Sequence, residues 1–386
     1  MLRRLLSWGL AVVMLVGLLG CSLPQVSAEE RLFLNVGLDF LGAYDLPRTE
    51  FEGTTVGGLS AIAYDRQRDR LYALSDDRSN LAPARFYTLQ LQIGTDDQGA
   101  IALQSVDLES VTFLQQESGE LYPPGSIDPE GLALSPRNSV FISSEGDTDG
   151  GIAPFVDEFD LQTGQWKTRL PIPERFVPQE VEGTLQGIRN NRGFESLTLN
   201  PGTMSANPLE PFRLFTATEA ALLQDESDDP DSPNPLLSRF LHYLIGDTLP
   251  TLLAEHMYVL EPLGDTDLEN GLTELLAVDQ AGHFLTLERS FGLTGFSARI
   301  FQMVIGGATD TSGVRTYRNG IGGIEPLRKR LVLDLAELEI PLDNLEGMTP
   351  GPRLPDGSQS LLLVSDDNFN DTQKTQFLLF RLNGIS

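Results

Sequence analysis

Carboxylates that return at matching places along the chain are the residues with the clearest capacity for chemistry. Acids beside the small residue that opens an alternating apolar segment are Glu130, Glu195 and Glu346. Acids that end the apolar segment after each opening are Asp76 with Asp77, Glu145, Glu219, Glu288 and Asp366. Converging carboxylates repel one another unless protons or cations neutralise them, and hard oxygen ligands favour Ca²⁺ or Mg²⁺.

This recurrence predicts a cation site, with calcium as the expected ion. The acids that end segments are the candidate metal ligands, and the three glutamates beside the openings are the candidate catalytic residues. Ser60 takes the place of glutamate in the first copy. For any single acid, a turn cap or an ion pair with arginine remains the alternative.

Arginines form a second recurring set. They begin three of the five segments that come third in each copy, at Arg85, Arg239 and Arg299. A guanidinium group can hold two phosphate or carboxylate oxygens at once, so these residues are candidates for binding an anionic ester. A salt bridge to the recurring acids of a neighbouring copy is the alternative reading.

Several other chemistries lack their signatures. No G-x-S-x-G motif is present, which leaves a serine hydrolase unsupported. The three histidines, His242, His256 and His283, are too scattered for a zinc motif, and the single cysteine excludes an internal disulfide or a multi-cysteine metal site. Neither a P-loop nor a dinucleotide fingerprint occurs.

The elements that must position these residues form a weak internal repeat. The opening segments are 58–63, 130–134, 193–199 and 346–349, with a more degenerate copy at 272–278. After a turn, each leads to a second apolar segment: 71–77, 140–145, 214–219, 282–289 and 361–367. Third segments follow at 85–89, 155–159, 239–243, 299–303 and 376–380. The alternation is typical of half-buried strands, and no sustained helical periodicity competes with it.

The repeat predicts an all-β fold, a β-propeller over residues 31–386. A sixth unit assembled from 32–45 and 329–336 would give about 60 residues per unit, so we expect six blades. Radial stacking buries both faces of each four-stranded sheet and places equivalent residues in rings around one axis. A pair of β-sandwiches or a β-helix is the alternative architecture.

The composition agrees with this fold and narrows the partners. The 386 residues carry a net charge of −28, which disfavours nucleic acid because an acidic surface repels phosphate backbones. With 40% hydrophobic residues the chain is globular, and 37 Gly and 24 Pro suit short strands joined by turns. We expect a monomer whose partner is an anionic small molecule.

The first thirty residues indicate export. Two arginines precede an apolar run, and the run ends at Cys21 in a sequence that resembles a bacterial lipobox. We therefore expect a lipoprotein signal peptide over 1–20, lipidation of Cys21 and a linker over 21–30. The protein would then be periplasmic or at the cell surface, with a lipid anchor as its only membrane contact. Ordinary cleavage after Ala28 is the alternative.

The ordered series of acidic turns resembles the phytase-like domain family, also called the esterase-like activity of phytase family. The segments that carry this resemblance are 58–62 with 75–77, 128–132, 193–197 and 344–348, and the likeness extends over about Leu38 to Leu382. The resemblance implies a propeller, usually exported by bacteria. Through its likeness to calcium-dependent β-propeller phytases, it also implies calcium ions that bind phosphate and activate water.

The leading functional hypothesis is therefore an exported, calcium-dependent hydrolase of phosphoric esters. A second hypothesis is a non-catalytic lipoprotein whose calcium is structural and whose propeller serves as a binding or envelope scaffold. A serine carboxylesterase is the third, supported only by the family label.

Overall fold

A computed structural model describes residues 31–95, 99–202, 210–227 and 236–385. The described residues from Asn35 onward form a β-propeller of five four-stranded blades. The leader and Cys21 lie outside the described residues. No α-helix occurs among the described residues, and no helix there is long and apolar enough to cross a membrane.

Four blades follow the chain from the inner strand to the outer strand. Blade 1 is β4 (Leu59–Asp65), β5 (Arg70–Ser75), β6 (Arg85–Thr95) and β7 (Ile101–Phe113). Blade 2 is β8 (Pro129–Ser135), β9 (Ser139–Ser144), β10 (Phe155–Asp160) and β11 (Trp166–Arg169). Blade 3 is β14 (Phe194–Leu199), β15 (Phe212–Thr218), β16 (Leu237–Ile245) and β17 (Thr251–Val259). Blade 4 is β18 (Asp267–Ala277), β19 (His283–Gly292), β20 (Gly295–Val304) and β21 (Arg328–Asp334).

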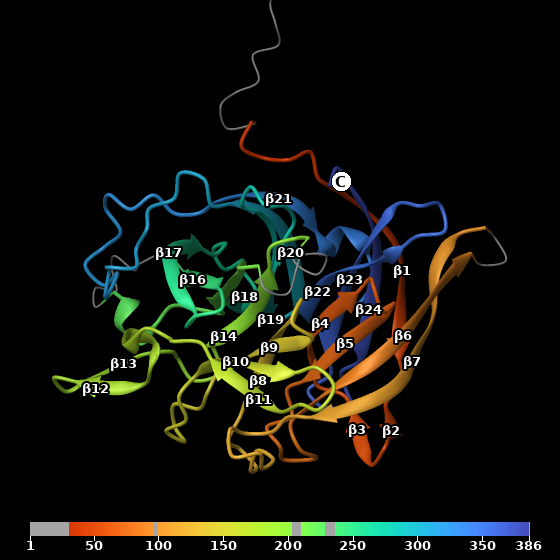
Figure 1. The fold of residues 1–386 in the computed structure, drawn as a ribbon. Coiled ribbons are helices and arrows are strands. Elements are labelled where there is room, and N and C mark those ends of the chain that lie inside the picture. Colours follow the sequence, from red (N-terminus) through yellow and green to blue (C-terminus); the bar gives the residue numbers. More distant parts are fainter. Residues whose placement is uncertain (1–30, 96–98, 203–209, 228–235, 386) are drawn as a thin grey trace, which may run out of the picture. The chain divides into compact units, whose positions relative to one another are not determined.

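Blade 5 is assembled from both ends of the propeller. Its strands are β22 (Asn344–Arg353), β23 (Gln359–Asp366), β24 (Thr375–Asn383) and, as the outer strand, β1 (Gly37–Leu46). β1 runs antiparallel to β24, from Gly37 opposite Asn383 to Leu46 opposite Thr375. Figure 1 shows this closure as the red β1 beside the blue β24.

The prediction of six blades is wrong. The residues assigned to a sixth unit are the outer strands of two different blades: β1 completes blade 5, and β21 completes blade 4. Two small hairpins, β2 (Thr49–Phe51) with β3 (Thr54–Val56) and β12 (Gln179–Val181) with β13 (Thr184–Gln186), add to the blades. Short 3-10 helices occupy Glu174–Phe176, Leu223–Asp225 and Leu335–Leu338.

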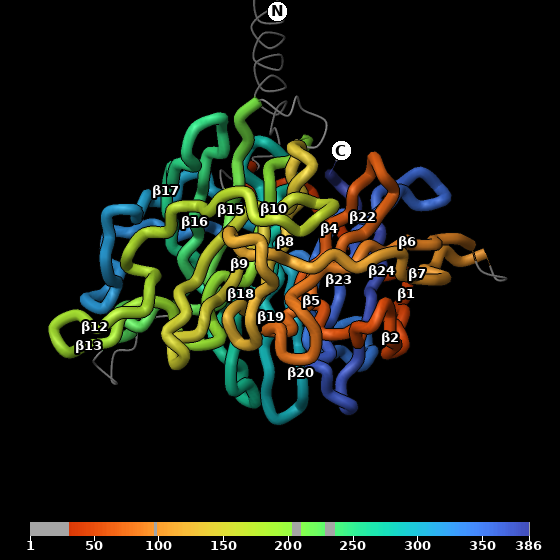
Figure 2. The backbone as a smooth tube through the Cα atoms, turned by 60° about the horizontal axis from the view of Figure 1, so that its bottom comes forward, coloured from red at the N-terminus to blue at the C-terminus, as the bar shows by residue number. Residues whose placement is uncertain are grey.

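The five inner strands contact one another in the closed order β4, β8, β14, β18, β22 and back to β4. Each pair of adjacent blades shares one apolar core. In β5, Leu71 and Ala73 pack toward blade 5 whereas Tyr72 and Leu74 pack toward blade 2, because successive side chains of a strand point to opposite faces. Figure 2 follows the chain through these blades as a tube.

Candidate metal centre

Each of the five inner strands carries an equivalent β-bulge, which lies near the start of the strand in four blades and in the middle of β18 in blade 4. At this bulge the ladder to the second strand skips one residue in four blades and two in blade 2. The skipped residues are Ser60, Glu130 with Gly131, Glu195, Thr273 and Glu346. A bulge leaves its extra residue unpaired and changes the direction of its side chain. We call Ser60, Glu130, Glu195, Thr273 and Glu346 the bulge ring.

The hydroxyl residues of the bulge ring connect blades. The Ser60 hydroxyl donates to the carbonyl of Pro129 in blade 2, at 3.3 Å, and the Thr273 hydroxyl donates to that of Leu345 in blade 5, also at 3.3 Å. The other three members of the ring are glutamates.

A second ring lies at or just after the ends of the second strands in four blades and inside β19 in blade 4. The backbone amides of Asp76, Glu145 and Glu219 donate back to the start of their inner strands, at 2.8–3.1 Å. In blade 5, Asp366 is paired with Asn344, and in blade 4 the corresponding position is occupied by Arg289, paired with Gly271. We call Asp76, Glu145, Glu219, Arg289 and Asp366 the strand-end ring.

Four carboxylates of the two rings form adjoining triads together with Asp128, which lies just before β8. Oxygens of Asp128, Glu130 and Glu145 lie within 4.8 Å of one another, and so do oxygens of Glu145, Glu195 and Glu219. Glu145 belongs to both triads, hydrogen-bonds the Glu195 carboxyl and accepts the amide of Gly193 at 2.7 Å. The two triads could therefore hold two neighbouring cations through one shared ligand.

The remaining acids of the rings lie around Asn344. Its side-chain amide donates to Glu346 Oε1 at 2.7 Å and to Asp366 Oδ2 at 3.4 Å. Asp366 also accepts the amide of Asn368 at 2.8 Å. Asp76 is electrostatically coupled to both Asp366 and Glu346, so the three acids belong to one cluster.

Eight carboxylates share this region with two guanidinium groups: Asp76, Asp128, Glu130, Glu145, Glu195, Glu219, Glu346 and Asp366, with Arg78 and Arg289. We call the eight acids the acidic cluster. Arg78 pairs with Asp128 through contacts of 2.6 and 2.8 Å, and its side chain is one-third exposed. Without cations, most of the negative charge of this cluster is uncompensated.

Burial and mutual repulsion raise the pKa values of seven acids of the cluster. Burial raises the pKa of Glu145 to about 8, that of Asp366 to about 7 and that of Asp128 to about 6. Burial, with the charge of neighbouring acids, holds the pKa values of Asp76, Glu130, Glu195 and Glu346 well above their ordinary range. The cluster therefore takes up protons when no cation is present.

Two local features fit a bound cation. Asp76 Oδ1 is inaccessible to solvent and has no hydrogen-bond partner, which is costly for a buried carboxylate oxygen. A Cβ at Gly58 would collide with this oxygen, and a Cβ at Gly271 would collide with Glu219 Oε1. Glycine at both places leaves room for the carboxylates. The donors are all hard oxygens, which suits Ca²⁺ or Mg²⁺.

The structure brings seven of the sequence-derived candidates into the acidic cluster: Glu130, Glu195, Glu346, Asp76, Glu145, Glu219 and Asp366. It places Asp77 and Glu288 elsewhere. Asp77 pairs with Arg85 at 2.7 Å and accepts backbone amides of the following turn. Glu288 contacts Lys329 and accepts the hydroxyl of Tyr258 at 2.7 Å.

The three arginines proposed to bind substrate are all in ion pairs within their own blades. Arg85 and Arg239 are completely buried, and Arg239 forms two 2.8 Å contacts with Asp225 and a further contact with Glu255. Arg299 pairs with Asp334 across β20 and β21 at 2.9 Å. The three arginines therefore form salt bridges, but these bridges lie within single blades, and only Asp77 among the partners is one of the recurring acids.

Sequence reasoning missed four residues at the site, namely Arg78, Asp128, Arg289 and Asn344. A signal for Arg289 was present. The acid follows Ser or Thr in four copies, whereas Glu288 occupies that Ser/Thr position in the fifth copy, which leaves Arg289 in the position of the acid. A shift of one residue turns a side chain to the opposite face of a strand.

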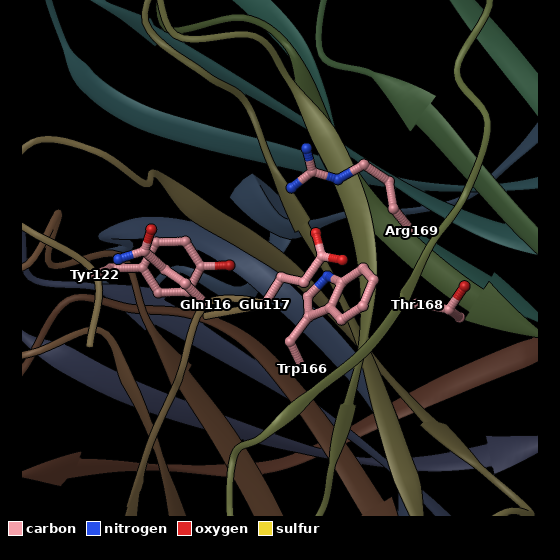
Figure 3. Close-up of a pocket in the computed structure, with 6 residues that line it drawn as sticks. All are labelled: Gln116, Glu117, Tyr122, Trp166, Thr168 and Arg169. Atoms are coloured by element: carbon pink, nitrogen blue, oxygen red, sulfur yellow. The ribbon is translucent and has the colours of Figure 1, made fainter. Parts of the chain in front are cut away.

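A separate cleft of 490 Å³ lies between β11 and the segment after β7 (Figure 3). It is lined by Gln116, Glu117, Tyr122, Trp166, Thr168 and Arg169. Buried Asp157 orients Trp166 and Arg169 through hydrogen bonds of 2.8–2.9 Å. None of the candidate residues from the sequence lines this cleft.

Comparison with known families identifies the fold. The family model "Phytase-like: Esterase-like activity of phytase" matches residues 54–369. The chain belongs to the phytase-like family. The match includes the inner strands of all five blades of this phytase-like propeller, and hence both rings. No curated protein matches the chain.

Solved structures with similarity to the phytase-like chain are distant. One is a chain from the S. cerevisiae Dbp5 complex with Nup159, Gle1, IP6 and ADP, at 12% identity and a TM-score of 0.32, covering 90% of this chain and 95% of that chain. Another is the Dos1 propeller, at 8% identity and a TM-score of 0.30, covering 89% and 95%. The WD40 domain of SCAP from fission yeast has 11% identity and a TM-score of 0.26, covering 90% and 74%. These TM-scores carry no argument about function.

Proposed function

We propose that this phytase-like propeller is a calcium-dependent hydrolase of phosphoric esters. The observation that supports the proposal most strongly is the pair of carboxylate triads that share Glu145. Adjoining cations with a common ligand are an arrangement suited to phosphoryl chemistry. Bound at this site, such ions would lower the pKa of a water molecule and offset charge on phosphoryl oxygens.

Residues of the two triads would hold the cations and a proton. Glu145 would be the shared ligand, flanked by Asp128 with Glu130 and by Glu195 with Glu219. Burial, followed by the charges of Glu145 and Glu219, raises the pKa of Glu195, so Glu195 can hold a proton there until a cation displaces it.

Exposure indicates the side from which a substrate would approach. Within the acidic cluster, Asp76, Glu130 and Glu346 are partly exposed, and they belong to blades 1, 2 and 5. Arg78 borders the same side, where its guanidinium group can meet an anionic ester. We therefore propose an anionic small molecule as the substrate and Arg78 as its first contact.

The cellular setting is part of the proposal. The leader over residues 1–20 and the lipobox-like Cys21 support export and a lipid anchor. Export would bring the acidic cluster into compartments where millimolar calcium can load sites of modest affinity. We propose a monomeric periplasmic or cell-surface protein without nucleic-acid partners.

The direct test is hydrolysis of p-nitrophenyl phosphate, a phosphodiester and phytate, with calcium and with chelator. We expect calcium-dependent turnover that falls about 10²-fold or more in Glu195→Gln, since this change removes a ligand and a proton site. Glu158→Gln is the matched control, because Glu158 is a buried glutamate of blade 2 that hydrogen-bonds Ser139 outside the cluster. Turnover that is equal with calcium and chelator would contradict the proposal.

A second candidate is a non-catalytic propeller stabilised by calcium. Deep burial favours it, because Glu145 and Asp366 are each only 1% exposed and Glu219 is 3% exposed. In that case calcium would raise the unfolding temperature without supporting turnover of any of the three esters. The same preparations distinguish the two candidates when thermal unfolding is measured beside hydrolysis.

A further inference from the structure

Arg289 breaks the pattern of the strand-end ring. In four blades, this ring position holds an acid, and in blade 4 it holds a guanidinium group. The bulge ring changes in the same blade, where Thr273 replaces glutamate. Blade 4 therefore contributes no carboxylate to either ring and supplies a fixed positive charge instead.

The contacts of Arg289 extend to both neighbouring blades. Its Nη2 donates to Glu219 Oε1 of blade 3 at 2.8 Å, and its Nη1 donates to Asn344 Oδ1 of blade 5 at 2.6 Å. Nη1 also lies 3.9 Å from Glu346 Oε1. The side chain is only 14% exposed, so solvent screens these interactions weakly.

Electrostatics keep this group charged. Burial lowers the pKa of the guanidinium group, but the charges of Glu219, Glu346 and Glu195 outweigh burial and raise it. A divalent cation placed among Glu219, Glu346 and Asn344 would therefore face a permanent positive charge within a few ångströms. Glu219 and Glu346 cannot fully neutralise both the guanidinium group of Arg289 and a divalent cation.

We infer that Arg289 takes the place of a metal ion in its sector and thereby limits the number of divalent cations that the cluster holds. This inference rests on the proposed function, because it assumes that the acidic cluster binds cations. Cations would bind on the side formed by blades 2 and 3, where the two triads lie. Arg289, which contacts the triad member Glu219, would neutralise the acids between blade 3 and blade 5.

The test counts calcium ions bound to the purified full chain, by calorimetry and by elemental analysis. We expect Arg289→Glu to bind one more calcium ion per chain than wild type. Arg289→Gln should bind the first calcium ion at least tenfold more tightly than wild type, because repulsion is lost while no new ligand is added. Glu288→Gln is the control, since this neighbour faces Lys329 and should leave the number of ions unchanged.

A purely structural arginine gives a different result. In that case, folded Arg289→Glu would bind the same number of ions as wild type, and this outcome would overturn the inference while leaving the proposed function intact. If wild type bound no calcium, the proposed function would fail, but calcium bound by Arg289→Glu would still support the role of Arg289. Should Arg289→Glu fail to fold, the affinity of Arg289→Gln decides, and an unchanged affinity overturns the inference.

Discussion

Glu145 allows the electrostatics of the acidic cluster to be tested without knowledge of the substrate. Its carboxylate belongs to both triads and is 1% exposed. The change Glu145→Gln keeps the size of the side chain and an oxygen that can accept the Gly193 amide, but it removes the titrating group. The variant should therefore alter how the stability of the metal-free protein depends on pH.

The expected magnitude follows from the pKa of this group. Burial raises the pKa of Glu145 from its ordinary value of 4.5 to about 8 in the folded protein. Between these values the folded state holds a proton that the unfolded state releases, so the free energy of unfolding falls as the pH rises. Linkage gives a loss of about 3.5 kcal/mol between pH 5 and pH 8 for this group alone. The total free energy of unfolding of a typical domain is only about 5–15 kcal/mol.

The assay is urea unfolding of metal-free protein at pH 5, 6, 7 and 8, repeated with calcium. Wild type without metal should lose stability steadily across this range, because Asp128 and Asp366 also have raised pKa values and act in the same direction. Glu145→Gln should match wild type near pH 5 and be about 3 kcal/mol more stable at pH 8. Calcium should abolish the loss in wild type, since ionised carboxylates are then ligands.

The reasoning would be refuted by metal-free wild type that is equally stable, or more stable, at pH 8 than at pH 5. It would also fail if Glu145→Gln lost as much stability over this range as wild type. Either result would mean that Glu145 is not held in a buried, mutually repelling set of carboxylates.

Two further predictions concern the space beside Asp76 and the buried ion pair of Arg239. Gly58→Ala should weaken calcium binding at least tenfold, because its Cβ would collide with Asp76 Oδ1 and its φ of +59° disfavours alanine; Gly53→Ala, also at positive φ but with open space around its Cβ, is the control, and equal losses in calcium affinity would contradict the prediction. Arg239→Met should destabilise the protein by about 3–5 kcal/mol in chemical unfolding, since it removes the buried guanidinium group that contacts the buried carboxylates of Asp225 and Glu255. Arg299→Met, at an exposed pair, should cost at most about 1 kcal/mol, and similar costs for the two variants would count against the difference in burial.

Much of the acidic cluster was predictable because short sequence patterns mark each copy of the repeat. An opening small residue beside an acid marks the bulge, and an acid after Ser or Thr marks the end of the second strand. These signals depend only on strand alternation and turns, which short segments encode. The same signals could not predict the ion pair between Asp77 and Arg85. The conformation of the segment between these residues decides whether each side chain points toward the rings or away from them.

The number of blades depends on information that no local segment carries. β1 and β21 have the same alternating pattern as any outer strand, and only the hydrogen bonds of β1 to β24 show that β1 belongs to blade 5. Arg289 was missed for a related reason. The fifth copy has Glu288 where the others have Ser or Thr, and choosing the acid by residue type instead of by register placed the ring one residue too early.

Closure by β1 also relates the charge of the acidic cluster to the stability of the closed ring. Glu346 and Asp366 lie on β22 and β23, near the end of the chain, and blade 5 is complete only when β1 returns to pair with β24. Closing the ring brings these two acids against Asp76 of blade 1, so like charges oppose closure. Protons or divalent cations that neutralise these acids would therefore favour the closed ring over a ring in which blade 5 has separated from blade 1.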